Sequence, residues 1–257
     1  MNYKSVYNII KFLLVLLILA GCALHKHYIP LVVYAGFIGA LFIVNKNNSE
    51  KLKADIIETH DTIIFVVIAV TIIRFFIAEL RWIPSGSMEP TLQINDRIVV
   101  EKLTKFPQLV KSHRFENRPN RGDIMIFYPP FVELKTAPWS VFARLTGFFC
   151  EDVAYIKRVI GLPGETIEIK PNSKGGYHVY INNKPLEEEY IMSEYDYHKC
   201  KQEMHCGPLE IPQGHYFMMG DNRGNSMDSR FWGTLSEERF IGHAVFIYWP
   251  FKHAKGL

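Results

Sequence analysis

Long apolar segments dominate the first third of the chain, and short strand-like segments dominate the rest. The apolar segments lie near residues 6–24, 28–44 and 62–78, and each contains at most one charged residue. A helix of 17 residues rises roughly 25 Å, close to the thickness of a bilayer core. We therefore predict a membrane anchor over residues 1–79 with two or three transmembrane helices.

The first apolar segment allows a second interpretation. It ends in the sequence LAGC at Cys22, which resembles the cleavage motif of bacterial lipoprotein signals. A retained helix and a signal cut at Cys22 give the same topology, because the lysines of the linker 45–61 favour the cytoplasm in both cases. Residues 80–257 are therefore predicted to lie outside the cytoplasm.

The part of the chain after residue 80 shows β-strand patterning and no long stretch with the helical period. Turn-forming residues separate its strand-like segments. These segments are 97–101, 123–128, 154–160, 166–169, 178–181, 215–219 and 243–249. We predict a mostly β domain with an open or barrel-like sheet and an irregular insertion near 131–152.

Composition excludes two classes of protein. Of the 257 residues, 48% are hydrophobic and 21% are charged, which is too apolar for a disordered chain. The net charge is +3, and no basic run forms a stripe for phosphate groups. We therefore expect no nucleic-acid partner.

Two cysteines lie close together in a polar stretch. Cys200 and Cys206 have a spacing that can close a small disulfide in an oxidising compartment. Two free thiols are the plain alternative, and a zinc site with His198 and His205 is a third. The disulfide is the interpretation that we favour.

A serine after the third apolar segment is a candidate nucleophile. Ser87 lies in the sequence PSGSMEPT at 84–91, where a neighbouring glycine and flanking prolines can hold a hydroxyl exposed beside backbone N–H groups. An ordinary turn would have the same composition. The segment also differs from the Gly-x-Ser-x-Gly elbow.

A lysine in a strand-like segment is a candidate base. Lys157 lies in the sequence AYIKRVI at 154–160, and burial of one side of such a strand would desolvate the amine and lower its pKa. The alternative is a surface lysine beside Arg158. No histidine of the chain lies in a motif that also holds a carboxylate partner.

A third cluster, GDNRGNSMDSR at 220–230, is rich in turn-forming and charged residues. It can be a solvated loop or a rigid hydrogen-bonded loop that supports an active site. It does not fit a calcium-binding EF-hand loop, because the terminal glutamate is missing.

Four segments, taken together, resemble the motifs of bacterial signal peptidase I. They are SGSMEPTL at 85–92, RGDI at 121–124, YIKRVIGLPGE at 155–165, and 220–230 followed by Trp232-Gly233. They occur in the order found in that family and downstream of membrane segments.

The resemblance implies a signal-peptidase/LexA-like β-fold and a Ser/Lys catalytic dyad. Ser87 matches the nucleophile, and Lys157 matches the general base. Ser85 matches a residue whose hydroxyl joins the backbone N–H of Ser87 in the oxyanion hole, and Ser226 matches the serine that orients the base. Asp228 and Arg230 match a structural ion pair. Ile83 and Ile156 match residues that line the substrate pocket.

The implied function is that of a membrane-bound serine endopeptidase. It would cut N-terminal signal peptides from exported preproteins after small residues of the Ala-x-Ala type, without a cofactor or metal. Its partners would be preprotein signal peptides and membrane lipid in a multi-pass enzyme of the bacterial inner membrane; nothing is implied about oligomeric state. The alternatives are a catalytically silent, membrane-tethered binding domain and another Ser/Lys peptidase of the same fold.

Overall fold

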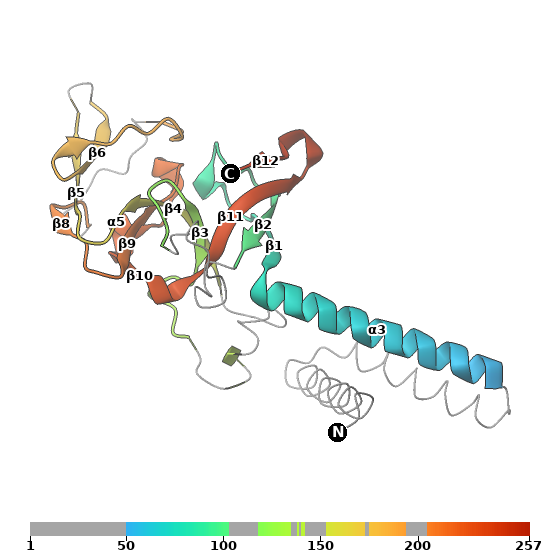
Figure 1. Cartoon of the computed structure of the whole chain (residues 1–257). Coiled ribbons are helices and arrows are strands. Elements are labelled where there is room, and N and C mark those ends of the chain that lie inside the picture. Colours follow the sequence, from blue (N-terminus) through green and yellow to red (C-terminus); the bar gives the residue numbers. More distant parts are fainter. Residues whose placement is uncertain are drawn as a thin grey trace. The chain divides into compact units, whose positions relative to one another are not determined.

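Figure 1 shows the computed structural model of the chain. It describes residues 50–102, 118–134, 138, 140–141, 153–172, 175–193 and 205–257. The chain divides into two compact units. One consists of Met1–Arg74 with Lys135–Glu151, and the other consists of Phe75–Leu134 with Asp152–Leu257. The predicted apolar segments near 6–24 and 28–44, and most of the predicted insertion near 131–152, lie outside the described residues.

One long helix, α3 (Glu50–Phe76), makes up most of the described part of the first unit. Its segment Ala54–Arg74 is 21 residues long and apolar enough, by length and composition, to cross a membrane. It is the one helix of this kind within the ranges that the structure describes. The predicted segment 62–78 falls largely within this helix, which begins earlier and gives way to a strand at Ala78.

The second unit is mostly β, as predicted, and its larger sheet is antiparallel throughout the described strands. The strand order is β1-β2-β11-β3-β4-β9-β10, and β12 pairs with β11. The bounds are β1 (Ala78–Trp82), β2 (Arg97–Glu101), β3 (Ile124–Phe127), β4 (Tyr155–Gly161), β9 (His215–Met219), β10 (Leu235–Ser236), β11 (Phe240–Trp249) and β12 (Lys255–Gly256). Because β4 lies between β3 and β9, both of its edges are covered by neighbouring strands.

A smaller antiparallel sheet follows β4 in the sequence, with the strand order β7-β6-β5-β8. Its strands are β5 (Thr166–Pro171), β6 (Tyr177–Ile181), β7 (Lys184–Pro185) and β8 (Leu209–Glu210). The short helices in the described part of the second unit are η1 (Gly86–Met88), η3 (Arg223–Asn225), α5 (Ser229–Trp232), η4 (Glu237–Arg239) and η5 (Phe251–His253).

Each of the seven predicted strand segments overlaps an observed strand, and no end differs by more than three residues. Alternation of apolar and polar residues, or a short apolar run, was therefore sufficient to locate these seven strands. The strands β7, β8, β10 and β12 have two residues each, which is too short for such a pattern.

Strand β1 was missed because its burial is inverted. Glu79 points inward and is buried, whereas Leu80 and Trp82 are exposed. The Glu79 carboxylate is paired with Lys102 Nζ at 2.5 Å and with Arg81. Burial opposes ionisation of Glu79, but these two cations outweigh it and lower the pKa of the carboxyl. A pattern that places apolar residues inward cannot identify such a strand.

Apolar clusters on both sheets hold the candidate site in place. One cluster contains Met88 and Leu92 of the connection 83–96 between β1 and β2, which carries Ser87 and is named the serine segment here, together with Ile156 of β4. A second joins the two sheets, since it contains residues of β4, β5, β6 and β9. Burying a large aliphatic side chain contributes about 1.5–3 kcal/mol, so the first cluster anchors the serine segment firmly to the sheet.

Candidate active site

The serine segment crosses from β1 to β2, and its backbone is tied at both ends. Ser87 is the central residue of the one-turn helix η1. The next two apolar side chains, Met88 and Leu92, are fully buried, and Leu92 N donates to Met88 O at 2.9 Å. Farther out, Ile83 N donates to Asp96 O at 2.9 Å. These contacts fix the turn that holds the Ser87 hydroxyl.

Lys157 reaches this hydroxyl from the neighbouring part of the sheet. It lies on β4, opposite Met125 of β3, and only 4% of its surface is exposed. Its Nζ donates to Ser87 Oγ at 2.7 Å and to the carbonyl of Ile156 at 2.9 Å. Two residues 70 positions apart in the sequence are therefore in direct hydrogen-bond contact.

Burial changes the acidity of this lysine. Desolvation lowers the pKa of Lys157 from its ordinary value of 10.5 to about 8. The carboxylates of Asp228 and Asp221 favour the ammonium and limit the shift, whereas the Arg230 guanidinium adds to it. A neutral amine is thus accessible in mildly alkaline solution, within reach of a hydroxyl proton.

A close backbone approach brings the segment 220–230, named the third motif here, against Ser87. A side chain at Gly220 would place its Cβ 2.3 Å from Ser226 Oγ and 2.4 Å from the Ser87 carbonyl oxygen, so only glycine fits there. Two residues later, Asn222 N donates to the same carbonyl at 3.2 Å. Ser226 is buried in this neighbourhood. The bonds described for Lys157 Nζ go elsewhere, so a role of Ser226 in orienting the base stays a prediction.

Asp228 and Arg230 form a buried ion pair within the third motif. Arg230 Nε and Nη2 donate to Asp228 Oδ1 and Oδ2 at 2.8 and 2.9 Å, and neither side chain is exposed. Asp228 Oδ2 also accepts from Gly220 N at 3.1 Å. Burial opposes ionisation, but Arg230 and the Gly220 N–H outweigh it and hold the pKa of Asp228 below its ordinary value. The pair thereby links α5 to the residue that touches Ser87.

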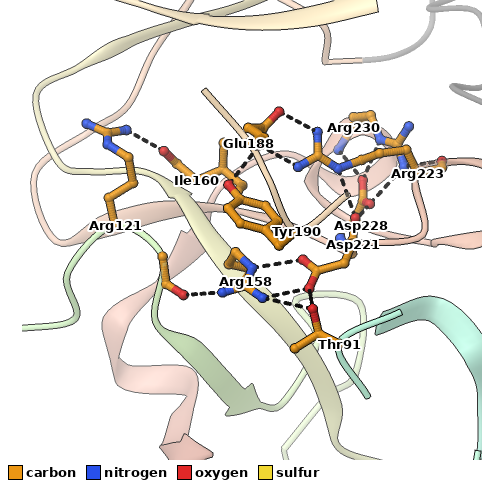
Figure 2. Close-up of polar contacts among 12 residues, drawn as sticks. Thr91, Arg121, Arg158, Ile160, Glu188, Tyr190, Asp221, Arg223, Asp228 and Arg230 are labelled. Atoms are coloured by element: carbon orange, nitrogen blue, oxygen red, sulfur yellow. Dashed lines mark hydrogen bonds and ion pairs between the residues drawn. The ribbon is translucent and has the colours of Figure 1, made fainter. Parts of the chain in front are cut away.

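A second buried pair, Arg158 with Asp221, was not identified in the sequence. Arg158 donates through Nε and Nη2 to the two Asp221 oxygens at 2.9 and 2.7 Å (Figure 2). Thr91 Oγ1 donates to Asp221 Oδ2 at 2.5 Å. From the sequence, Arg158 was named only as the neighbour of Lys157 and as part of the segment 155–165, and the structure shows that it is almost fully buried. Its partner is 63 positions away, a distance that no local pattern spans.

Comparison with known proteins assigns the family. Residues 56–249 match the family described as signal peptidase, peptidase S26. The chain is 42% identical over 200 residues to signal peptidase I of Leptolyngbya laminosa, which covers 78% of this chain and 83% of that one. It is 31% identical to signal peptidase I of Pseudomonas fluorescens, over 81% of this chain and 77% of that one. Signal peptidase I S of Bacillus subtilis is also 31% identical, over 82% of this chain and 98% of that one.

The chain belongs to the signal peptidase family S26. This confirms the resemblance drawn from the four sequence segments and identifies the protein as a protease. In this peptidase, Arg121 joins two of those segments, because its guanidinium donates to the Ile160 carbonyl and to the Glu165 carboxylate.

The remaining predicted site residues lie around the serine turn of the peptidase. Ser85 is exposed and precedes η1, and its side chain does not cap that turn. Ile83 and Ile156 are both buried in the cluster that contains Met88. Their roles in the oxyanion hole and the substrate pocket stay predictions.

Only one of the two cysteines of the predicted disulfide lies within the described residues. Cys206 is disulfide-bonded and packs in the cluster that joins the two sheets. Cys200 lies outside the described residues, so its pairing with Cys206 stays a prediction.

Proposed function

We propose that this peptidase removes N-terminal signal peptides from exported preproteins, with Ser87 as nucleophile and Lys157 as general base. The observation that carries the proposal is the 2.7 Å contact between Lys157 Nζ and Ser87 Oγ at a lysine whose pKa is lowered to about 8. A nucleophile within hydrogen-bond reach of a base with a pKa near the working pH is the requirement for acyl transfer.

In the acylation step, neutral Lys157 takes the proton of Ser87 Oγ as this oxygen attacks the scissile carbonyl. The oxyanion that forms accepts from the backbone N–H of Ser87 and from the hydroxyl of Ser85. Lys157 then gives its proton to the leaving amine as the C–N bond breaks. Lys157 then takes a proton from water as the water oxygen attacks the acyl carbonyl, and it gives that proton to Ser87 Oγ as the bond between this oxygen and the acyl carbon breaks. This restores the serine hydroxyl and the neutral lysine and releases the carboxylic acid product.

The substrate would be selected by size. Ile83 and Ile156 are β-branched and held in the packed cluster beside the serine turn, so they can exclude large side chains. Small residues of the Ala-x-Ala type before the cut would be accepted. The segments near 6–24, 28–44 and 62–78 would anchor the peptidase in the bacterial inner membrane, with membrane lipid around them and the catalytic domain on the extracytoplasmic side.

The test is a cleavage assay with the full chain in detergent and a preprotein whose signal ends in Ala-x-Ala. Mass spectrometry should place the cut directly after the last alanine. Replacing that alanine by tryptophan should slow cleavage by about 10- to 100-fold, since overpacking a defined apolar pocket costs about 1–3 kcal/mol. Tryptophan at the middle position is the matched control. Cleavage that ignores the size of the last residue would contradict the proposal.

The pH dependence of the reaction should report the titration of Lys157. Only the neutral amine can accept a proton, so kcat/KM should rise with pH and reach half of its plateau near the lysine pKa of about 8. The measurement is kcat/KM on a peptide substrate between pH 6 and pH 10. A midpoint near 6.5 would instead indicate a histidine base.

A further inference from the structure

The segment 186–192, named the strap here, connects the smaller sheet with the third motif. At its beginning, Leu186 N donates to Val179 O of β6 at 2.9 Å. At its end, Met192 N donates to the backbone carbonyl of Asp221 at 3.1 Å. The strap thus reaches Asp221, which lies between the two residues that contact the Ser87 carbonyl, Gly220 and Asn222. It belongs to none of the four segments that carry the family resemblance.

A buried arginine receives its counter-ion from the strap. Arg223 is fully buried, and its Nη1 and Nη2 donate to Glu188 Oε2 and Oε1 at 3.0 and 2.5 Å. Its Nε donates to the carbonyl of Gly220 at 2.9 Å. Only 3% of the Glu188 side chain is exposed, whereas the neighbouring Glu187 and Glu189 are exposed. A buried guanidinium without its carboxylate is strongly unfavourable, so Glu188 stabilises the position of Arg223.

The strap also covers the second buried ion pair. The ring of Tyr190 lies over the Arg158 guanidinium, 4.0 Å from its central carbon (Figure 2). The Tyr190 hydroxyl donates to Glu188 Oε1 at 2.9 Å. Burial and the nearby Glu188 carboxylate raise the pKa of Tyr190, so the phenol keeps its proton and remains a donor. One segment therefore contacts both arginines that hold the chain at Gly220–Asp221.

Residues 220–222 contact the backbone of the serine turn. Gly220 lies against the Ser87 carbonyl with no space for a side chain. Asn222 donates from its backbone N to Ser87 O at 3.2 Å and from Nδ2 to Gly86 O at 3.1 Å. A shift of 220–222 would therefore shift the serine turn relative to Lys157.

We propose that Glu188 and Tyr190 are positioning residues of the Ser/Lys dyad, which act through Arg223 and Arg158. The contacts described above for Glu188 and Tyr190 go to Arg223, to Arg158 and to each other, and through these arginines they hold residues 220–222 against the serine turn. The proposal rests on the proposed function for its kinetic consequences and on the contacts alone for its structural ones.

The kinetic experiment replaces Glu188 by glutamine in the full chain. Glu188→Gln should lower kcat by about 10-fold and change KM by less than about twofold, because misplacement of reacting groups affects the chemical step. Glu187→Gln and Glu189→Gln are the matched controls in the same segment and should match the wild type. The acidic limb of the pH profile should move to lower pH, since a displaced Asp221 no longer favours the charged form of Lys157. A loss of folded enzyme alone would lower kcat without moving the profile.

Hydrogen exchange of the backbone amides provides a second readout that needs no activity. Protection of Gly220 and Asn222 should fall in Glu188→Gln and remain unchanged in Glu187→Gln. Tyr190→Phe, which keeps the ring over Arg158, should cause a smaller loss of protection and a fall in kcat of about threefold, in line with one lost hydrogen bond.

The outcomes separate this inference from the proposed function. A wild-type chain that cuts no preprotein would contradict the proposed function, while the exchange data would still test the strap. Wild-type protection and an unmoved pH profile in Glu188→Gln would overturn the positioning role, whatever the activity. If Glu188→Gln does not fold, Tyr190→Phe decides by the same two readouts.

Discussion

Replacing Lys157 by methionine should remove activity and stabilise the fold at neutral pH. Loss of a general base lowers rates by about 10²- to 10⁴-fold. Ser87→Ala should cause a loss of similar size, and the double variant should lose little more, because the two groups act as one unit. The measurement is kcat/KM of the three variants at pH 8.

The expected gain in stability follows from the lowered pKa of Lys157. The pKa of Lys157 is about 8 in the folded chain and 10.5 when the side chain is fully solvated, as in the unfolded chain. Folding therefore disfavours the charged form of this lysine. Below pH 8 the buried charge therefore costs stability, and this cost fades between pH 8 and 10.5, where the unfolded chain is still protonated. Two lost hydrogen bonds offset part of the gain. We expect Lys157→Met to raise the free energy of unfolding by about 1–3 kcal/mol at pH 7 and by less at pH 10.

Lys170→Met is the matched control, since Lys170 is a partly exposed strand residue paired with Glu168. It should change neither the cleavage rate nor the urea unfolding curve. A Lys157→Met variant that keeps a tenth of wild-type activity, or that unfolds more easily at pH 7, would contradict the picture of a costly buried base.

Most strands of four or more residues could be predicted from the sequence, because each forms an alternating segment or a short apolar run. Strand β9 was predicted to the residue, from the segment 215–219. Strand β1 could not be, because Glu79 takes the inward position that the pattern assigns to an apolar residue. Its burial depends on Lys102, which arrives from the end of β2.

The two residues of the candidate dyad could be predicted from the sequence, but the residues that hold them in position could not. Ser87 and Lys157 lie in short motifs whose residue types suggest their chemistry. The local sequence pattern did not decide whether Lys157 is a surface lysine or a buried general base. Only the family resemblance favoured the buried base. The residues that support the dyad include two ion pairs, Glu188 with Arg223 and Arg158 with Asp221. Each pair joins segments that are far apart in the sequence, so it can be identified only in the folded structure.

Asp228→Asn should destabilise the fold by about 3–5 kcal/mol, the usual cost of leaving a buried charge without its partner. The variant leaves the Arg230 guanidinium fully buried and opposite a neutral amide. The measurement is the free energy of unfolding in urea at pH 7. Glu168→Gln is the matched control, because Glu168 and Lys170 are also two residues apart but lie at the surface, where the cost is about 0–1 kcal/mol.

The same variant should behave differently in acid and at the active site. The folded pKa of Asp228 is depressed, so its contribution to stability is present above the unfolded pKa of about 3.9 and is lost as pH falls through the folded value. The difference between wild type and Asp228→Asn should therefore shrink toward low pH. Asp228 also favours the charged form of Lys157, so its removal should shift the acidic limb of the activity profile of the folded variant below 8. A difference that is constant with pH, together with an unmoved limb, would mean that the carboxylate charge is not what supports the site.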